Sequence, residues 1–108
     1  MTHDLERGAI HWVELDKRRP ALLISPTLRN QLASDVMVIP ISASSRRMSW
    51  HVRLGRGEGG LAAESMAKCE QLVTVPKGLI EPRPLGPALS PARMREVERA
   101  LMRAVGIL

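Results

Sequence analysis

The chain has 108 residues, a length that suits one domain with a single modest hydrophobic core. One cysteine excludes an internal disulfide. Without a membrane-length apolar run or a signal-peptide pattern, we expect a cytoplasmic protein with no membrane association. Sixteen lysines and arginines against 11 acidic residues give a net charge of +5, which suits a polyanion-binding surface and an ordinary solvated surface equally well. With no phenylalanine, no tyrosine and two tryptophans, extensive base stacking by aromatic side chains is excluded.

Apolar runs in the first half of the chain predict strands. The first, at residues 9–15, has Ile10 and Trp12 on one face, so we expect Trp12 in the core. The second, at residues 20–25, is apolar throughout, as in a strand buried on both faces. The polar residues 27–35 are expected to form a loop.

Shorter elements follow in the middle of the chain. A third strand is predicted at residues 36–42, where Pro40 indicates a bulge or a sheet edge. A basic loop at residues 43–49 and a short strand at residues 51–54 come next. Residues 64–75 fit one long strand or two short ones.

The clearest element is a C-terminal amphipathic helix. Ser90 can cap it and Pro91 suits its first turn. Apolar residues then recur every three or four positions, at Met94, Val97, Leu101, Ala104, Val105 and Leu108. The sequence therefore predicts a single α+β, mainly β, domain over residues 1–108: a curved antiparallel sheet or barrel with a terminal helix.

The polar residues suggest only a few kinds of chemistry. The three histidines are not paired at metal-ligand spacing, and no glycine-rich phosphate loop opens a helix. Three polar clusters remain as candidate site elements: residues 17–19, residues 42–47 and His51. If the second and third strands are neighbours, Arg19 and Ser42 share one surface.

The order of segments resembles the MazF/PemK toxin family from Arg7 to Leu108. Arg7 to Val13 resembles its opening strand, R-G-D-I-Y-W-V, and Arg18 to Ser25 resembles its R-P-A-L-V-I-S signature. The remaining matches are Asn30 after that strand, Val38 to Ser42 for V-x-P-I-T, Gly60 to Ser65 with Glu70 to Val75 for the G-L…D-S…Q-I-x-T-V region, and Leu89 to Leu101 for the closing helix.

The resemblance implies a small SH3-like antiparallel barrel of the CcdB/MazF/PemK type that forms a homodimer. It implies a metal-independent endoribonuclease toxin, without a cofactor, that cuts single-stranded RNA to leave a 2′,3′-cyclic phosphate and a 5′-hydroxyl and is blocked by an acidic, MazE-like antitoxin. Arg19 matches the catalytic arginine, and Ser42 matches the catalytic threonine. The expected RNA-binding residues are Arg18, Asn30, Ser44, Arg46, Arg47, Trp50, His51 and Ser65.

This sequence departs from the family pattern in the loop before Arg19, which is short and has no Gly-rich, Glu-containing insertion. Arginine is a poor general base because its pKa is above ~12, so His11 and His51 are the physical candidates for that role. Apart from the resemblance, Arg19 also fits a solvated turn charge and Ser42 a strand-end hydroxyl bonded to backbone. Cys69 is expected to be a small buried hydrophobe.

Two other functions compete with the ribonuclease. A protein-directed gyrase poison of the same fold, like CcdB, uses a tryptophan at the end of its C-terminal helix, and this chain ends without one. A non-catalytic RNA-binding module would not need both Arg19 and Ser42.

Overall fold

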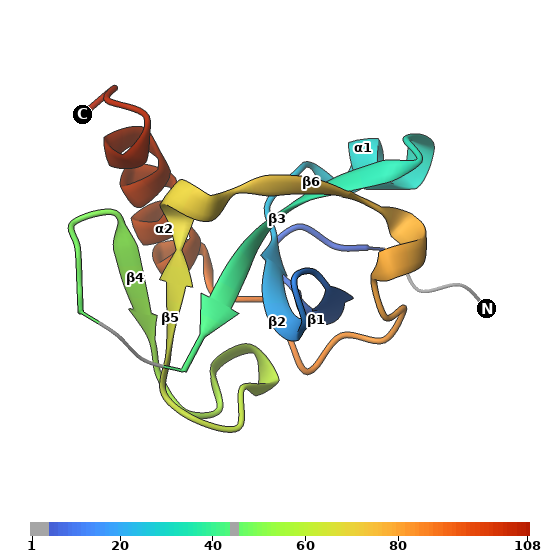
Figure 1. The fold of residues 1–108 in the computed structure, drawn as a ribbon, viewed down its shortest axis with the longest axis horizontal. Coiled ribbons are helices and arrows are strands. Elements are labelled where there is room, and N and C mark those ends of the chain that lie inside the picture. Colours follow the sequence, from blue (N-terminus) through green and yellow to red (C-terminus); the bar gives the residue numbers. More distant parts are fainter. Residues whose placement is uncertain (1–4, 44–45) are drawn as a thin grey trace.

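The computed structural model describes residues 5–43 and 46–108. Within them, antiparallel strands form a single curved sheet in the order β1-β2-β3-β5-β4, with β6 also paired to β3 (Figure 1). The strands are β1 (Ile10–Glu14), β2 (Arg18–Leu23), β3 (Asp35–Ser42), β4 (His51–Leu54), β5 (Ser65–Lys68) and β6 (Val73–Pro76). The helices are α1 (Thr27–Leu32) and α2 (Pro91–Ala104), with short 3-10 turns η1 (Glu58–Gly60), η2 (Cys69–Gln71) and η3 (Lys77–Leu79).

Strand β3 is the centre of the sheet. It pairs with β2 along one side; along the other it pairs with β6 up to Val38 and with β5 from Ile41. Pro40 lies in the gap between these two pairings, where its missing N–H costs no ladder hydrogen bond. The prediction of an edge is wrong, because β3 is central, but the interruption it signalled is real. Of the two alternatives for residues 64–75, one long strand or two short ones, the structure has two short strands, β5 and β6.

The sheet is not closed into a barrel. Among the described residues, one isolated bridge between Val13 and Ile80 returns the chain from β6 to β1. The next residue extends this contact, since the Glu81 amide donates to the Trp12 carbonyl over 2.9 Å. The predicted class, a mainly antiparallel sheet with a C-terminal helix, is confirmed, and the barrel is a strongly curved open sheet.

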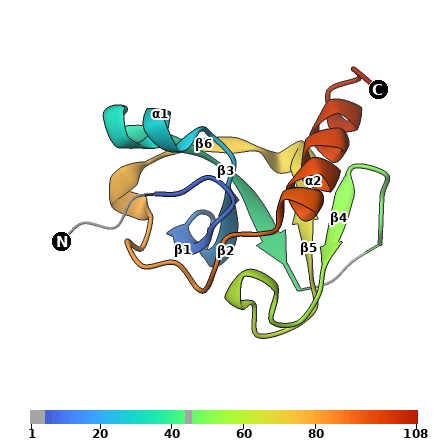
Figure 2. The same ribbon diagram turned by 180° about the vertical axis from the view of Figure 1, so that it is seen from behind.

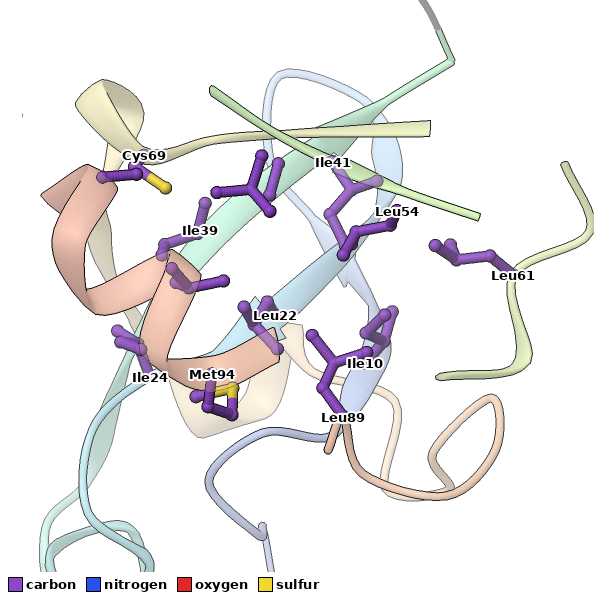
Figure 3. Close-up of a cluster of buried hydrophobic side chains, with 14 residues drawn as sticks. Ile10, Leu22, Ile24, Ile39, Ile41, Leu54, Leu61, Cys69, Leu89 and Met94 are labelled. Carbon is purple, nitrogen blue, oxygen red and sulfur yellow. The ribbon is translucent and has the colours of Figure 1, made fainter. Parts of the chain in front are cut away.

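The buried side chains form two clusters, not the single core that the length suggested. Strand β2 shows why: Leu22 faces one cluster, while Ala21 and Leu23 face the other, as expected for a strand buried on both sides. The larger cluster lies beneath α2 (Figure 3) and contains Ile10, Leu22, Ile24, Ile39, Ile41, Val52, Leu54, Leu61, Ala67, Cys69, Leu89, Met94, Val97 and Ala100. The smaller contains Val13, Ala21, Leu23, Val36, Val38, Val75 and Ile80.

Helix α2 covers one side of the sheet, as Figure 2 shows, and begins as predicted. The Ser90 hydroxyl caps it by accepting a hydrogen bond from the Arg93 amide over 3.1 Å. The predicted apolar face runs too far, however, because the helix ends at Ala104 and leaves Val105 and Leu108 exposed. No described helix is long and apolar enough to cross a membrane.

A second, short helix contradicts the loop predicted at residues 27–35. Helix α1 is only six residues long, too short for Leu28 and Leu32 to establish a helical repeat in the sequence, and both leucines are exposed. What holds it is a buried amide. Asn30 donates to the backbone carbonyls of Leu5 and Ser25 over 2.8 and 3.1 Å and accepts from the Ser25 hydroxyl.

Candidate active site

Strand register places Arg19 and Ser42 on one face. Ala21 lies opposite Pro40 in the β2–β3 pair, and alternate residues of a strand share a face. Continued by two residues, the same register sets Arg19 opposite Ser42. Both residues line one cleft of about 410 Å³ at this end of the strands, so the structure brings the two expected catalytic residues together.

The cleft is basic on one wall. Lys17, Arg18 and Arg19 follow one another along it, and its described lining contains no carboxylate and no histidine. Its full described lining is Trp12, Lys17, Arg18, Arg19, Pro20, Ile41, Ser42, Ala43, Gly60, Leu61, Ala62, Ala63, Ser65 and Leu85. Such a wall favours an anionic ligand.

Glycine is required where the opposite wall begins. Gly60 has φ +87°, and a β-carbon there would clash with the Leu85 carbonyl, so only glycine lets these two loops approach so closely. Ser65, the first residue of β5, follows a few residues later, and its hydroxyl donates to the Ala63 carbonyl over 2.8 Å. Ser65 is thus in the cleft, as expected, with its hydrogen already engaged.

Arg19 is held by a residue that the sequence analysis missed. Its Nε and Nη2 donate to the two carboxylate oxygens of Asp16, each over 2.8 Å. This guanidinium holds the pKa of the Asp16 carboxyl far below its usual range, and the carboxylate in turn raises the pKa of Arg19. The three-residue spacing across a tight charged turn was the signal available in the sequence. Arg19 is therefore not simply a solvated turn charge.

Ser42 has the opposite character. Its Oγ is buried and has no hydrogen-bond partner within the described residues, so its hydroxyl is not bonded to backbone. Leaving a buried hydroxyl unsatisfied costs ~1–3 kcal/mol, and such groups in native proteins call for a specific explanation. Ser42 itself lines the cleft, so a ligand that displaces the cover of this hydroxyl would supply the missing partner.

Several expected RNA-binding residues lie outside the described lining of this cleft. Asn30 is buried and its amide is used to hold α1. Arg46 and Arg47 are exposed on the loop after β3, and Ser44 falls outside the described residues. Trp50 packs edge-on against the His51 ring, with centroids 6.5 Å apart.

The two histidines considered as general bases are both buried. His51 Nδ1 accepts from the Met48 amide over 3.3 Å, which leaves Nε2 to donate to Glu70 over 3.2 Å. His11 Nδ1 lies 2.7 Å from the Glu81 carbonyl oxygen. Neither ring lines the cleft, so the structure does not bring a histidine to Arg19 and Ser42. The described residues contain no group of three or more His, Cys, Asp or Glu side chains that could hold a metal ion.

Two further expectations have opposite outcomes. Trp12 is not in the core: its side chain is 36% exposed and lines the cleft, because β1 extends beyond the cluster that buries Ile10. Cys69 is buried, as expected, and its burial raises the pKa of the thiol to about 12, so the thiol stays protonated at neutral pH.

Comparison with known proteins places this fold. The solved structure of the Mycobacterium tuberculosis toxin MazF-mt6 matches with a TM-score of 0.85 at 25% identity, over 93% of this chain and 98% of that one. A mycobacterial endoribonuclease in complex with its cognate antitoxin matches with 0.83 at 24% identity, over 95% and 96%. A chain of the MazE–MazF complex from Deinococcus radiodurans matches with 0.81 at 18% identity, over 98% and 99%.

A family model describes nearly the whole sequence. It covers residues 6–105, which include all the strands described above and the whole of α2. The chain belongs to the family of PemK-like, MazF-like toxins of type II toxin–antitoxin systems.

Proposed function

We propose that this toxin is a metal-independent endoribonuclease that cuts single-stranded RNA at short sequences and thereby inhibits translation and growth. The observation that carries the proposal is that Arg19 and Ser42 line the same basic cleft, with the Ser42 hydroxyl buried just beneath it and without a partner among the described residues. The proposal is also supported by the structural neighbours, which include a mycobacterial protein described as an endoribonuclease.

The reaction is a transesterification within the RNA. The ribose 2′-oxygen attacks the adjacent phosphorus and loses its proton, while the bond from phosphorus to the 5′-oxygen breaks and that oxygen takes up a proton. The products are a 2′,3′-cyclic phosphate and a 5′-hydroxyl. Negative charge grows on the phosphoryl oxygens, where a preorganised donor is worth ~3 kcal/mol of barrier.

Arg19 and Ser42 supply such donors without a metal. Among the described residues only Asp16 bonds to Arg19, through Nε and Nη2, which leaves Nη1 for a phosphate oxygen. The Ser42 hydroxyl donates to a phosphoryl oxygen and thereby gains its missing hydrogen bond. Arg18 and Ser65, from the same cleft, contact the flanking nucleotides.

The proposal includes two protein partners, a second copy of the chain and an acidic antitoxin. A net charge of +5 suits an acidic partner, and the structural neighbours include a complex with a cognate antitoxin. Exposed apolar side chains at the end of α2, on Val105, Ile107 and Leu108, offer surface for such contacts. Light scattering on the purified protein tests the homodimer directly: a mass near twice 11.9 kDa is expected, and a monomer at all concentrations contradicts it.

The ribonuclease is tested with long single-stranded RNA and excess chelator. We expect fragments with sharp ends, each carrying a cyclic phosphate, and sequencing of those ends gives the recognition site. Arg19→Ala is the control for contaminating nucleases: it should melt like the parent and lose cleavage by at least about 100-fold. Intact RNA with the parent protein overturns the proposal, and equal cutting by Arg19→Ala removes Arg19 from the mechanism.

A further inference from the structure

Trp12 occupies an unusual place for a large indole. It lies in the middle of β1, opposite Pro20 of β2, and is 36% exposed. Its ring lines the cleft that holds Arg19 and Ser42, and also an adjoining hollow formed by β1 and residues 78–82. The indole therefore stands on the ridge between a basic cleft and a second depression.

The Arg18 guanidinium covers this indole. It lies 4.7 Å from the ring centroid, and its Nη2 donates to Glu81 Oε1 over 2.9 Å. Glu81 is itself tied to the tryptophan, because its amide donates to the Trp12 carbonyl over 2.9 Å. The three residues form a closed set of contacts that presets the guanidinium over the indole.

The stack is open to solvent on its outer side. The Arg18 and Glu81 side chains are both 51% exposed, so the guanidinium is not sealed over the indole by other parts of the chain. Indole and guanidinium planes are the two kinds of surface on which unpaired RNA bases stack. The stack thus offers a flat, cationic surface beside the residues proposed to hold the phosphate.

We propose that the Trp12–Arg18 stack binds an unpaired nucleobase next to the scissile phosphate. This inference rests on the proposed ribonuclease function and adds a subsite to it. Arg18 and Arg19 are consecutive in β2, so their side chains point to opposite faces of the strand, but both residues line the cleft together with Trp12 and Ser42. A nucleotide whose phosphate is held by Arg19 and Ser42 at this end of the strand therefore has its base, or its neighbour's base, within reach of the stack. Because every base has a π-face, the subsite contributes more to affinity and positioning than to sequence choice.

The two tryptophans of the chain make a direct test. Trp50→Phe leaves Trp12 as the only indole, and Trp12→Phe leaves Trp50, which lies outside the described cleft lining. Each variant is titrated with 2′-O-methyl RNA hexamers of randomised sequence, which lack the attacking hydroxyl, and with abasic hexamers of the same charge. We expect saturable quenching of Trp12 by base-containing hexamers only, and unchanged Trp50 emission with either.

Affinity gives the second readout. Trp12→Leu should weaken binding of the base-containing hexamers about 5- to 150-fold, equivalent to ~1–3 kcal/mol, with little change for abasic hexamers, whereas Trp12→Phe keeps most of the affinity. Fluorescence anisotropy of end-labelled hexamers measures this, and thermal melting confirms that the variants are folded. Unchanged affinity of Trp12→Leu, or equal quenching by abasic hexamers, overturns the subsite.

Long single-stranded RNA separates failure of the subsite from failure of the function. If the Trp50→Phe variant cuts this RNA but its Trp12 fluorescence does not change when hexamers bind, the proposed ribonuclease function is supported and the proposed subsite is wrong. If neither cutting nor binding is seen, the ribonuclease function fails and the subsite falls with it.

Discussion

The Arg19 guanidinium and the Asp16 carboxylate form a bidentate pair, with both Nε–Oδ1 and Nη2–Oδ2 at 2.8 Å. The pair spans a short turn between β1 and β2, so it fixes the arginine rotamer without a long covering loop. A carboxylate presents two oxygens much as a phosphate does. Asp16 therefore both positions Arg19 and occupies two of the donors that an incoming phosphodiester would want.

The ionisation of Asp16 tests this pair without reference to RNA. Because the Arg19 side chain stabilises the charged carboxylate, the pKa of Asp16 is held far below its usual value. Carboxyl-carbon NMR through an acid titration should show Asp16 as the last aspartate to protonate. In Arg19→Ala its midpoint should rise toward the ordinary ~3.9.

A matched substitution completes that titration. Arg18→Ala removes the neighbouring guanidinium, which bonds Glu81 and not Asp16, and should leave the Asp16 midpoint unchanged. An Asp16 that titrates normally in the parent protein would show that the pair does not persist in solution.

Substitution of Ser42 should affect the stability of the fold and the cleavage of RNA differently. Ser42→Ala removes a buried hydroxyl that has no partner within the described chain, so the free energy of unfolding should stay level or rise by up to ~1 kcal/mol. If that hydroxyl donates to a phosphoryl oxygen, cleavage should fall about 10- to 1000-fold. Denaturant unfolding and initial cleavage rates measure the two effects.

Ser42→Thr is the control, since it keeps the hydroxyl. It should retain most of the cleavage that Ser42→Ala loses. Full activity of Ser42→Ala would mean that the cleft does not use this hydroxyl.

The sequence predicted this site only in part, for reasons visible in individual residues. Arg19 and Ser42 were singled out by the family resemblance, and the sequence placed them on one surface only on the condition that the second and third strands are neighbours, which the β2–β3 pairing meets. Asp16 was missed because its three-residue spacing from Arg19 shows only that the two side chains can meet across the turn, and not that they pair. The structural role of the Asn30 amide was not predicted, because buried amides and ligand-binding amides look alike in a sequence.

Prediction of the fold from the sequence was limited in the same way. Periodicity found all the strands and α2, where one face is apolar. It missed α1, which is too short for its two leucines to establish a helical repeat, and it placed Trp12 in the core because period-two alternation does not tell where along a strand the covering layer ends. Which part of a strand is buried depends on the elements that pack over it in the folded chain.

His51 should prove to be structural. Its two ring nitrogens are both used within the fold, by the Met48 amide and by Glu70, and the ring is outside the described cleft lining. His51→Ala should lower the free energy of unfolding by ~1–3 kcal/mol, through lost packing and unpaired polar groups. Cleavage per folded molecule should stay within a few-fold of the parent, with the same dependence on pH between 6 and 8.

The cleavage comparison needs a temperature well below the variant's melting point, so that the folded fraction is equal. Trp50→Phe, at the adjacent position, serves as a packing control. A pH profile that flattens in His51→Ala would instead make this histidine a participant in proton transfer.

The ion pair between Glu58 and Arg93 should make stability depend on pH. Arg93 donates to both Glu58 carboxylate oxygens over 2.8 Å and thereby ties η1 to the first turn of α2. This arginine lowers the pKa of Glu58.

A carboxyl whose pKa is depressed in the folded state adds stability above its unfolded pKa of ~4.3, and that stability is lost as the pH falls through the folded-state value. Glu58→Gln should therefore cost about 0.5–1 kcal/mol at pH 7 and less at pH 2. Calorimetry at both pH values checks this, with Glu96→Gln as the control, because Glu96 contacts the same arginine but is 57% exposed and should matter less. A cost of Glu58→Gln that is equal at both pH values would show that the lost contacts are not those of the ionised carboxylate.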